Sequence, residues 1–315
     1  MENRVGILVW VAALALFGTS CDHKKLCYDH RHTTVRVEFD WAAAPDAAPA
    51  GMCVLFYPAG GGAPEVKEFA GKEGGSIDIP DGVYDVVCYN ADASNVSYRD
   101  VESLDALEAC VRESSVMEGL DGGLAAPPLA DDGESVVAAP GRLWSCRVDG
   151  VELVPDGQGA DNVVVLAPRC VTRHVFWEVS PVTGSGNLRV VRAVLSGMSG
   201  SLRLGACEPA SALVSIPSAG EADGGDPEKL TGGFECFGCP GGTACRHMLT
   251  LYCWSAYGNV MASWDVTDQV HAASADGDIH IVVTVTGGIT IPEEGSGDFD
   301  PDVDGWDDRY SDVIM

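Results

Sequence analysis

Hydrophobic and polar residues alternate along much of the chain with the two-residue period of a half-buried β-strand. The clearest case is the segment 33–41, in which Val35, Val37, Phe39 and Trp41 alternate with polar side chains. Because successive side chains of a strand point to opposite faces of a sheet, we expect a strand with one buried face here. Shorter apolar runs predict further strands at 52–57, 76–79, 83–89, 136–138, 162–166, 175–179, 188–195, 201–204, 230–237, 248–256 and 279–285.

Turn signals separate these runs, and helical periodicity is rare. Pro80-Asp81-Gly82 lies between two expected strands, where proline presets φ and glycine tolerates a positive φ. Short helices are expected only at 102–114 and 268–273. Because the strands do not alternate with longer helices, a parallel α/β sheet is disfavoured. The predicted fold class is all-β, with two tandem β-sandwich (transthyretin-like) domains and short helical insertions.

Changes in composition set the expected boundaries. Residues 1–20 contain an unbroken apolar run at 5–17 that follows Arg4. A helix of this length reaches only about 20 Å, less than a hydrocarbon core of about 30 Å, so a cleaved secretory signal is favoured over a membrane-spanning helix. We expect an N-terminal sandwich at 21–168, a C-terminal sandwich at 169–291 and an acidic tail at 292–315 with a candidate terminal strand.

The cysteine directly after the leader carries chemistry of its own. Gly18-Thr19-Ser20 precedes Cys21, and this stretch resembles the signal of a bacterial lipoprotein. The resemblance implies that cleavage makes Cys21 the lipidated first residue, held in the outer membrane by acyl chains such as palmitate. Each buried acyl methylene contributes about 0.8 kcal/mol. Gly18 stands where such signals usually have Leu, and ordinary signal peptidase cleavage after Ser20 would instead leave a soluble exported protein.

The charge balance excludes whole classes of partner. The chain has 47 acidic residues against 19 Lys plus Arg, a net charge of −28 at pH 7. Such a surface repels a phosphate backbone, so no nucleic acid partner is expected. Binding to an anionic membrane through a basic patch is excluded for the same reason.

Four cysteines lie close together in the second half of the chain. They are Cys236, Cys239, Cys245 and Cys253, and His247 lies among them. An exported chain can form disulfides, and the eleven cysteines left after Cys21 make at least one thiol unpaired internally. One or two disulfides, unpaired core thiols and a structural zinc site are the alternatives. Zinc is the weakest, because the second pair is not compact, and we expect neither a metal nor another cofactor.

Acidic residues near the C-terminus are the remaining candidate ligands. Asp300, Asp302 and Asp304 match the opening half of a calcium loop, but Ser311 stands where the bidentate Glu belongs. A solvated acidic run is therefore favoured over weak calcium binding. No nucleophile motif or phosphate-binding glycine loop occurs, so we expect no enzymatic activity and assign no catalytic residue.

Several motifs together resemble one family over nearly the whole mature chain. They are 21–30 (CDHKKLCYDH) running into Phe39-Asp40-Trp41, 195–200 (LSGMSG), 247–250 (HMLT), 264–270 (WDVTDQV) and the ending around Gly305-Trp306. These segments resemble the fimbrillin-like and fimbrial-anchor surface lipoproteins of Bacteroidetes, many of which are known only as domains of unknown function. The resemblance implies a lipid-anchored protein, exposed on the outer membrane, that anchors or assembles a pilus-like fibre or is a minor subunit of it, and so contributes to adhesion.

The same resemblance implies how the partners bind. Fibres of this kind grow when a strand of one subunit completes the open sheet of the next, with backbone hydrogen bonds supplying affinity. The expected partners are other fimbrial subunits, and the candidate exchange strand lies at 306–315. Its apolar side chains are those of Trp306, Tyr310, Val313 and Ile314.

A second function fits the same scaffold. A surface lipoprotein of this architecture could bind a glycan or a host ligand instead of fimbrial subunits. Trp254, Trp264 and Trp306 would favour this alternative if they lay exposed in one groove, because aromatic faces stack on sugar rings.

Overall fold

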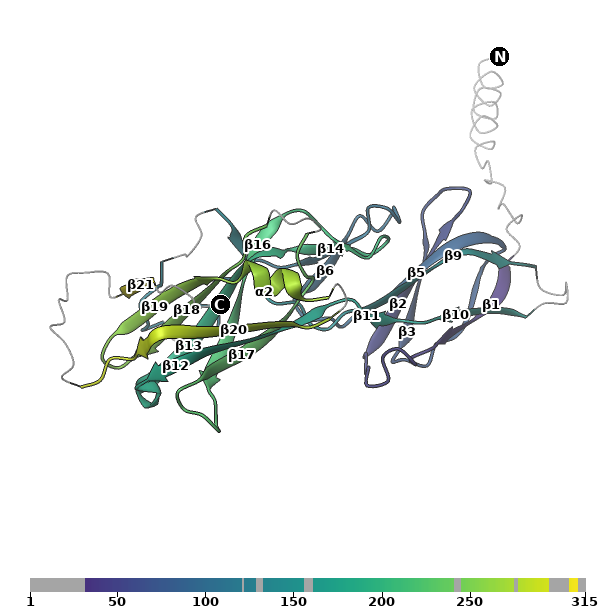
Figure 1. Ribbon diagram of the computed structural model, residues 1–315. Helices are drawn as coiled ribbons and strands as arrows, with labels where there is room; N and C mark the ends of the chain where they lie inside the picture. The colour runs from purple at the N-terminus through teal and green to yellow at the C-terminus, as the bar shows by residue number, and fades with distance from the viewer. Residues whose placement is uncertain are drawn as a thin grey trace, which may run out of the picture.

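The protein has two β-rich lobes arranged end to end (Figure 1). The computed structural model describes residues 32–120, 122–128, 133–155, 161–240, 245–274 and 277–294, together with the backbone of 306–310. No helix in these described ranges is both long and apolar enough to cross a membrane.

The first lobe packs a three-stranded sheet against a five-stranded sheet. The shared core between them contains Val35 and Val37 from one sheet and Val54, Phe56 and Val86 from the other, all at most 1% exposed. The three-stranded sheet has the order β10 (Asn162–Leu166), β1 (His32–Phe39), β4 (Gly75–Pro80). The five-stranded sheet has the order β11 (Arg169–Cys170), β9 (Trp144–Leu153), β5 (Gly82–Asn90), β2 (Gly51–Pro58), β3 (Glu65–Ala70).

The second lobe is built from one nine-stranded sheet that curls around its own core. Buried side chains from almost every strand of this sheet, Trp177, Leu195 and Leu251 among them, form a single apolar cluster. One sheet can enclose a common core only if it bends back on itself. Its order is β20 (Ile279–Thr290), β12 (Arg173–Thr183), β17 (Leu230–Cys236), β16 (Leu213–Ala222), β13 (Leu188–Ser199), β18 (Met248–Ser255), β19 (Asn259–Asp265), β21 (Trp306–Tyr310), and β8 (Ser135–Val136) pairs with β16.

A four-stranded sheet joins the lobes. Its order is β15 (Glu208–Pro209), β14 (Ser201–Arg203), β7 (Glu108–Val111), β6 (Val96–Arg99). Leu107, which directly precedes β7, and Ala109 and Leu202 on this sheet pack against Leu55 and Val87 on the five-stranded sheet. Strand β2 therefore has an apolar partner layer on both faces, which explains its unbroken apolar run 52–57.

The structure confirms a mostly β chain and corrects parts of the prediction. The helix expected at 102–114 is wrong, because its second half is β7, which pairs with β6 and β14. The expected helix at 268–273 is confirmed as α2 (Thr267–Ala272), and the one other described helix is the short η1 (Ser185–Asn187). A pair of tandem transthyretin-like sandwiches is not shown, because the second lobe is one curled sheet.

The division expected after residue 168 stays a prediction, as do the outer limits of the parts. Strand β7 pairs with β14 and β8 pairs with β16. The segment before residue 137 therefore contributes one strand to the sheet that joins the lobes and one to the nine-stranded sheet of the second lobe. The chain thus crosses between the lobes more than once.

Candidate functional site

The C-terminal strand β21 lies on the outer edge of the nine-stranded sheet. It pairs parallel with β19, in a register that places Trp306 opposite Asn259 and Tyr310 opposite Ser263. Residues 306–310 of the candidate exchange strand therefore pair within their own chain, where they extend the nine-stranded sheet. The structure describes only the backbone of β21, and Val313 and Ile314 lie outside the described residues.

The start of the described chain and the start of β21 lie toward opposite poles of the molecule (Figure 1). At the start of β1, the Thr33 hydroxyl donates to the Val154 carbonyl over 2.8 Å, at the end of β9. The other end of β9 faces the second lobe. There the Val171 N–H donates to the Leu143 carbonyl, and both side chains join the apolar cluster between the five-stranded sheet and the sheet that joins the lobes. In the second lobe, β21 begins beside Asn259, at the turn that faces away from the first lobe. The pole where the described chain starts is therefore far from the pole where β21 starts.

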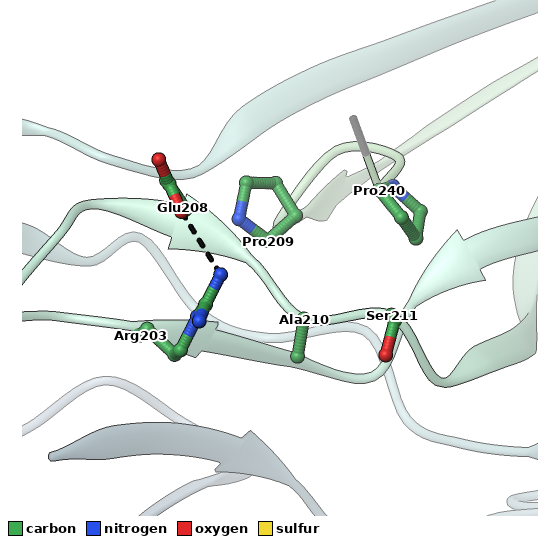
Figure 2. Close-up of a pocket in the computed structure, with 6 residues that line it drawn as sticks. All are labelled: Arg203, Glu208, Pro209, Ala210, Ser211 and Pro240. Atoms are coloured by element: carbon green, nitrogen blue, oxygen red, sulfur yellow. Dashed lines mark hydrogen bonds and ion pairs between the residues drawn. The ribbon is translucent and has the colours of Figure 1, made fainter. Parts of the chain in front are cut away.

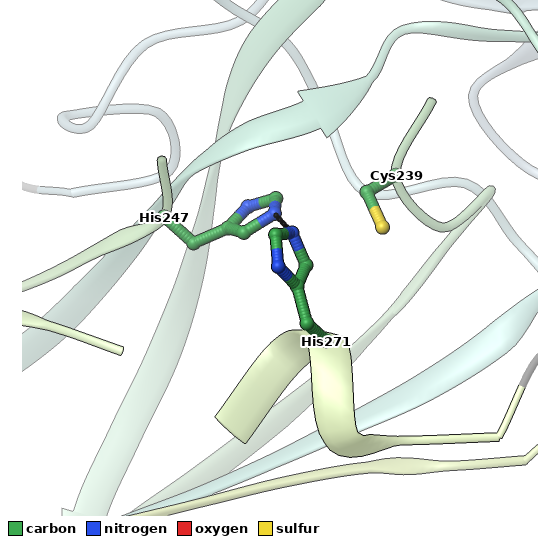
Figure 3. A group of neighbouring side chains, drawn as sticks. All are labelled: Cys239, His247 and His271. Carbon is green, nitrogen blue, oxygen red and sulfur yellow. Dashed lines mark hydrogen bonds between the residues drawn. The ribbon is translucent and has the colours of Figure 1, made fainter. Parts of the chain in front are cut away.

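A cysteine and two histidines converge in the second lobe (Figure 3). One ligand atom from each of Cys239, His247 and His271 lies within 4.8 Å of the other two. The Nε2 atoms of the two imidazoles are 3.2 Å apart, and the ring planes are nearly perpendicular at 89°. Cys239 follows β17, His247 directly precedes β18, and His271 lies on α2.

Three hydrogen bonds fix the position of His247. Its backbone N–H donates to Thr267 Oγ1 over 2.9 Å, its carbonyl accepts from the Val266 N–H over 2.9 Å, and its ring Nδ1 lies 3.1 Å from the Ser196 carbonyl. The ring passes so close to Gly197 that a Cβ there would lie 2.7 Å from Nδ1, and Gly197 has a φ of +77°. Glycine has no Cβ to meet the ring and adopts a positive φ without strain, so it fits this position. Burial lowers the pKa of His247 and raises that of the Cys239 thiol.

The other predicted cysteines do not join this cluster as a set. Cys236 and Cys253 lie in the apolar core at 0% and 1% exposure, where burial raises the pKa of each thiol to about 12. They act as small apolar side chains there. Cys245 lies close to Cys239, and after burial it is a further cause of the raised pKa of the Cys239 thiol. All ten cysteines within the described ranges are free thiols, and the disulfide alternative stays a prediction.

Sequence reasoning did not pair the two imidazoles of this cluster. His247 was noted only beside the cysteines, and His271 lies 24 residues later, beyond a hairpin and a turn. No ligand spacing rule links positions so far apart. The family-like motif at 264–270 is the sequence feature nearest to His271. It spans the end of β19 and most of α2, and it ends directly before this histidine.

A surface cavity of about 500 Å³ lies beside the sheet that joins the lobes (Figure 2). It is lined by Arg203, Glu208, Pro209, Ala210, Ser211 and Pro240. Its two charged groups pair with each other, with Arg203 Nη2 2.9 Å from Glu208. Because that pair is satisfied and the rest of the described lining is small, the described residues around the cavity form no acid–base or nucleophilic constellation.

The remaining predicted residues divide into two groups. Trp254 and Trp264 are each 1% exposed, so neither is available to stack on a sugar ring. Outside the described residues lie the predicted lipidation site and the weak calcium candidates, namely Cys21, Asp300, Asp302 and Asp304.

Comparison with known proteins places the chain in a family. The sequence profile described as "Domain of unknown function (DUF5119)" matches residues 20–218, more than half of the chain. The chain belongs to the DUF5119 family. This DUF5119 protein is 27% identical over 152 residues to a Bacteroides ovatus protein named "Putative fimbrium anchoring subunit Fim4B". That match spans 48% of this chain and 42% of the relative.

Solved structures share the fold of this DUF5119 protein. A crystal structure described as a "putative adhesin" from Bacteroides ovatus superposes with a TM-score of 0.64 at 18% identity, over 89% of this chain and 99% of that chain. A second "putative adhesin" from the same species superposes with a TM-score of 0.50 at 9% identity, over 86% and 94%. The predicted resemblance to the fimbrillin-like and fimbrial-anchor proteins of Bacteroidetes is confirmed at the level of the family.

Proposed function

We propose that this protein is a lipid-anchored, non-enzymatic component of the cell surface that anchors or assembles a pilus-like fibre. It would be held in the outer membrane through Cys21 and would bind other fimbrial subunits by strand exchange. Support comes from the DUF5119 match and from the relative named as a fimbrium anchoring subunit.

The observation that carries this proposal is the position of β21. A strand that adds to a sheet edge through backbone hydrogen bonds is the unit exchanged in β-augmentation. Strand β21 has this relation to β19, and residues 295–305 precede it in the chain. If β21 left, β19 would present an open edge, and the freed strand could add to an open edge of another subunit.

The polarity of the molecule also fits an anchor. The described chain begins at the first lobe's outer pole, eleven residues after the candidate lipid site Cys21. Strand β21 begins at the opposite pole. A lipid at one end would therefore hold the exchange edge away from the membrane, toward a growing fibre.

Replacement of Cys21 tests the anchor. The variant Cys21→Ala is expected in the soluble fraction of cells fractionated into membrane and soluble parts, while the parent chain remains with the outer membrane. A parallel Cys170→Ala variant, which removes an exposed thiol of the first lobe, controls for the loss of a cysteine. Full membrane retention of Cys21→Ala would contradict the proposal.

Two truncations test the strand. A chain ending at Gly305 lacks β21, whereas a chain ending at Tyr310 keeps the strand and lacks only 311–315. Fibre attachment, counted on intact cells by immunoelectron microscopy, should fall in the first variant and persist in the second. If both variants retain attachment, β21 has no role in exchange. If both lose it, residues 311–315 are required and β21 alone does not suffice for exchange.

The alternative of a glycan-binding protein loses its main support. It depended on Trp254, Trp264 and Trp306 lying exposed in one groove, and the first two are buried in the second lobe. The fibre proposal is therefore the one we carry forward.

A further inference from the structure

We propose that Cys239, His247 and His271 form a binding site for a borderline-soft divalent metal of the Zn²⁺ class. One thiolate and two imidazoles would supply three ligands, and the fourth position would hold water. This ligand set and number are those of tetrahedral zinc sites that keep one open position. The site is independent of strand exchange and of lipid anchoring.

The distance between the imidazoles matches a shared tetrahedral metal. With Zn–N bonds of about 2.0–2.1 Å, two imidazole nitrogens on one zinc lie about 3.3 Å apart. The Nε2 atoms of His247 and His271 are 3.2 Å apart. A thiolate completes the set within 4.8 Å, so only the Cys239 side chain has to move inward.

The tautomer of His247 follows from its partner. A carbonyl oxygen can only accept, so the Nδ1 that lies 3.1 Å from the Ser196 carbonyl must carry the proton. The Nε2 of the neutral ring then holds a lone pair that points at His271. This arrangement, a ligand nitrogen oriented by a carbonyl on the opposite ring nitrogen, is the usual outer-shell support of metal-binding histidines.

Rigidity and access also fit a site. His247 is wholly buried and held by contacts from Ser196, Val266 and Thr267, so its position is set before a metal arrives. Cys239 and His271 are only partly buried. They give an ion a path from solvent, which any metal site requires. Without metal, the two Nε2 atoms can share one proton in a hydrogen bond, and metal binding would displace that proton.

Metal titration of the full chain tests the proposal. The chain is purified under reducing conditions, stripped with a chelator and titrated with Zn²⁺ by calorimetry. It is titrated separately with Co²⁺, whose absorption reports tetrahedral geometry and thiolate ligation. We expect one ion per chain, a thiolate-to-cobalt charge-transfer band and a higher melting temperature with Zn²⁺. The variants His271→Ala and Cys239→Ser should each bind Zn²⁺ at least about 100-fold more weakly, since even outer-shell losses cost 10–100-fold.

Matched variants keep the outcome interpretable. His280→Ala removes an imidazole of the same lobe outside the cluster and should bind Zn²⁺ like the parent. Circular dichroism of metal-free samples checks that each variant is folded. His247 is avoided as a test position because it is buried in the fold. The proposal fails if the parent binds no Zn²⁺, if both cluster variants bind as the parent does, or if the protein from cells carries a Cys239–Cys245 disulfide that removes the thiolate.

Discussion

The side-chain amide of Gln269 bonds both backbone groups of Val282. Its Nε2 donates to the Val282 carbonyl over 3.0 Å, and its Oε1 accepts from the Val282 N–H over 2.7 Å. Strand β20 is the end strand of the nine-stranded sheet, and exposed edges of this kind invite pairing with other chains. The side chain of Gln269 on α2 therefore satisfies the two backbone groups of Val282 that a neighbouring strand would otherwise bond.

Removing this amide should open the β20 edge to self-association. The variant Gln269→Ala frees both backbone groups of Val282 and should form more dimers and larger species, measured by light scattering after gel filtration. The two hydrogen bonds contribute roughly 1–3 kcal/mol together, so the melting temperature should also fall. Asp268→Ala, on the same short helix, is the control and should stay monomeric. An unchanged Gln269→Ala variant would show that α2 covers the edge without this contact.

A buried carboxylate joins three strands of the inter-lobe sheet. Glu108 on β7 is 8% exposed, accepts a hydrogen bond from Ser201 on β14 over 2.5 Å, and accepts another from Arg99 Nε on β6 over 2.6 Å. Burial raises the pKa of Glu108, but these hydrogen bonds outweigh burial, and the net pKa lies below its ordinary 4.5. The charged form is thus favoured in the folded protein.

The stability of this junction should depend on acid pH. A carboxyl with a lowered folded pKa stabilises the fold above its unfolded pKa, and that contribution is lost as pH falls through the folded pKa. Glu108→Gln should lower the free energy of unfolding by about 1–2 kcal/mol at pH 7, and the gap to the parent should close on acidification below about pH 4.5. Urea melts at pH 7, 5 and 3 measure this. A gap independent of pH would assign the loss to packing. Glu208→Gln, whose pair with Arg203 is exposed, is the control.

How far the sequence predicts this fold can be judged from single strands. The alternation at 33–41 gave β1 nearly residue for residue, because one face of β1 is buried and the other is exposed. In the first half of β9, Trp144, Cys146 and Val148 alternate with polar residues, yet this strand was missed. Its alternation breaks at Gly150, where the pairing with β5 changes register. The segment 102–114 has apolar residues at helical spacing, yet Leu107 and Ala109 pack across the lobes. Tertiary contacts there overrode local periodicity.

The candidate site was predictable only in part. The terminal strand was expected from a cluster of apolar residues after an acidic run, and its backbone pairs with β19 as a strand should. Its partner edge could not be foreseen, because register and neighbours depend on distant chain segments. The imidazole pair depends likewise on how β18, β19 and α2 return the chain from His247 to His271.

The indole of Trp177 lies over two paired glycines in the second lobe. A Cβ at Gly220 would lie 2.4 Å from the ring, and a Cβ at Gly232 would lie at the same distance. Gly220→Ala should therefore lower the free energy of unfolding by about 1–3 kcal/mol, because the added methyl group overpacks the site. In a Trp177→Phe background the same change should cost less than half as much, because the smaller ring leaves room. A double-mutant cycle by denaturant unfolding measures this coupling. Gly186→Ala, with open space around it, should be neutral. Equal costs in both backgrounds would mean that the backbone, not the indole, resists the methyl group.

Among the cysteines that the structure describes, Cys88 and Cys146 are well placed for oxidation to a disulfide. They lie opposite each other on β5 and β9 with 3.3 Å between the sulfur atoms. Burial raises the pKa of Cys88, and the hydrogen bond from its thiol lowers the pKa of Cys146, which makes Cys146 the better nucleophile. Oxidised glutathione should therefore convert the pair to a disulfide and release two glutathione thiols.

This cross-link would close a loop of 58 residues and should raise the free energy of unfolding by up to about 4 kcal/mol. Peptide mass mapping and thermal melts with and without oxidised glutathione measure both effects. Cys146→Ser should abolish the disulfide and the added stability, whereas Cys170→Ser, at an exposed thiol of the same sheet, should retain both. Two free thiols at 88 and 146 after oxidation, in a protein that remains folded, would mean that the strand geometry forbids the bond.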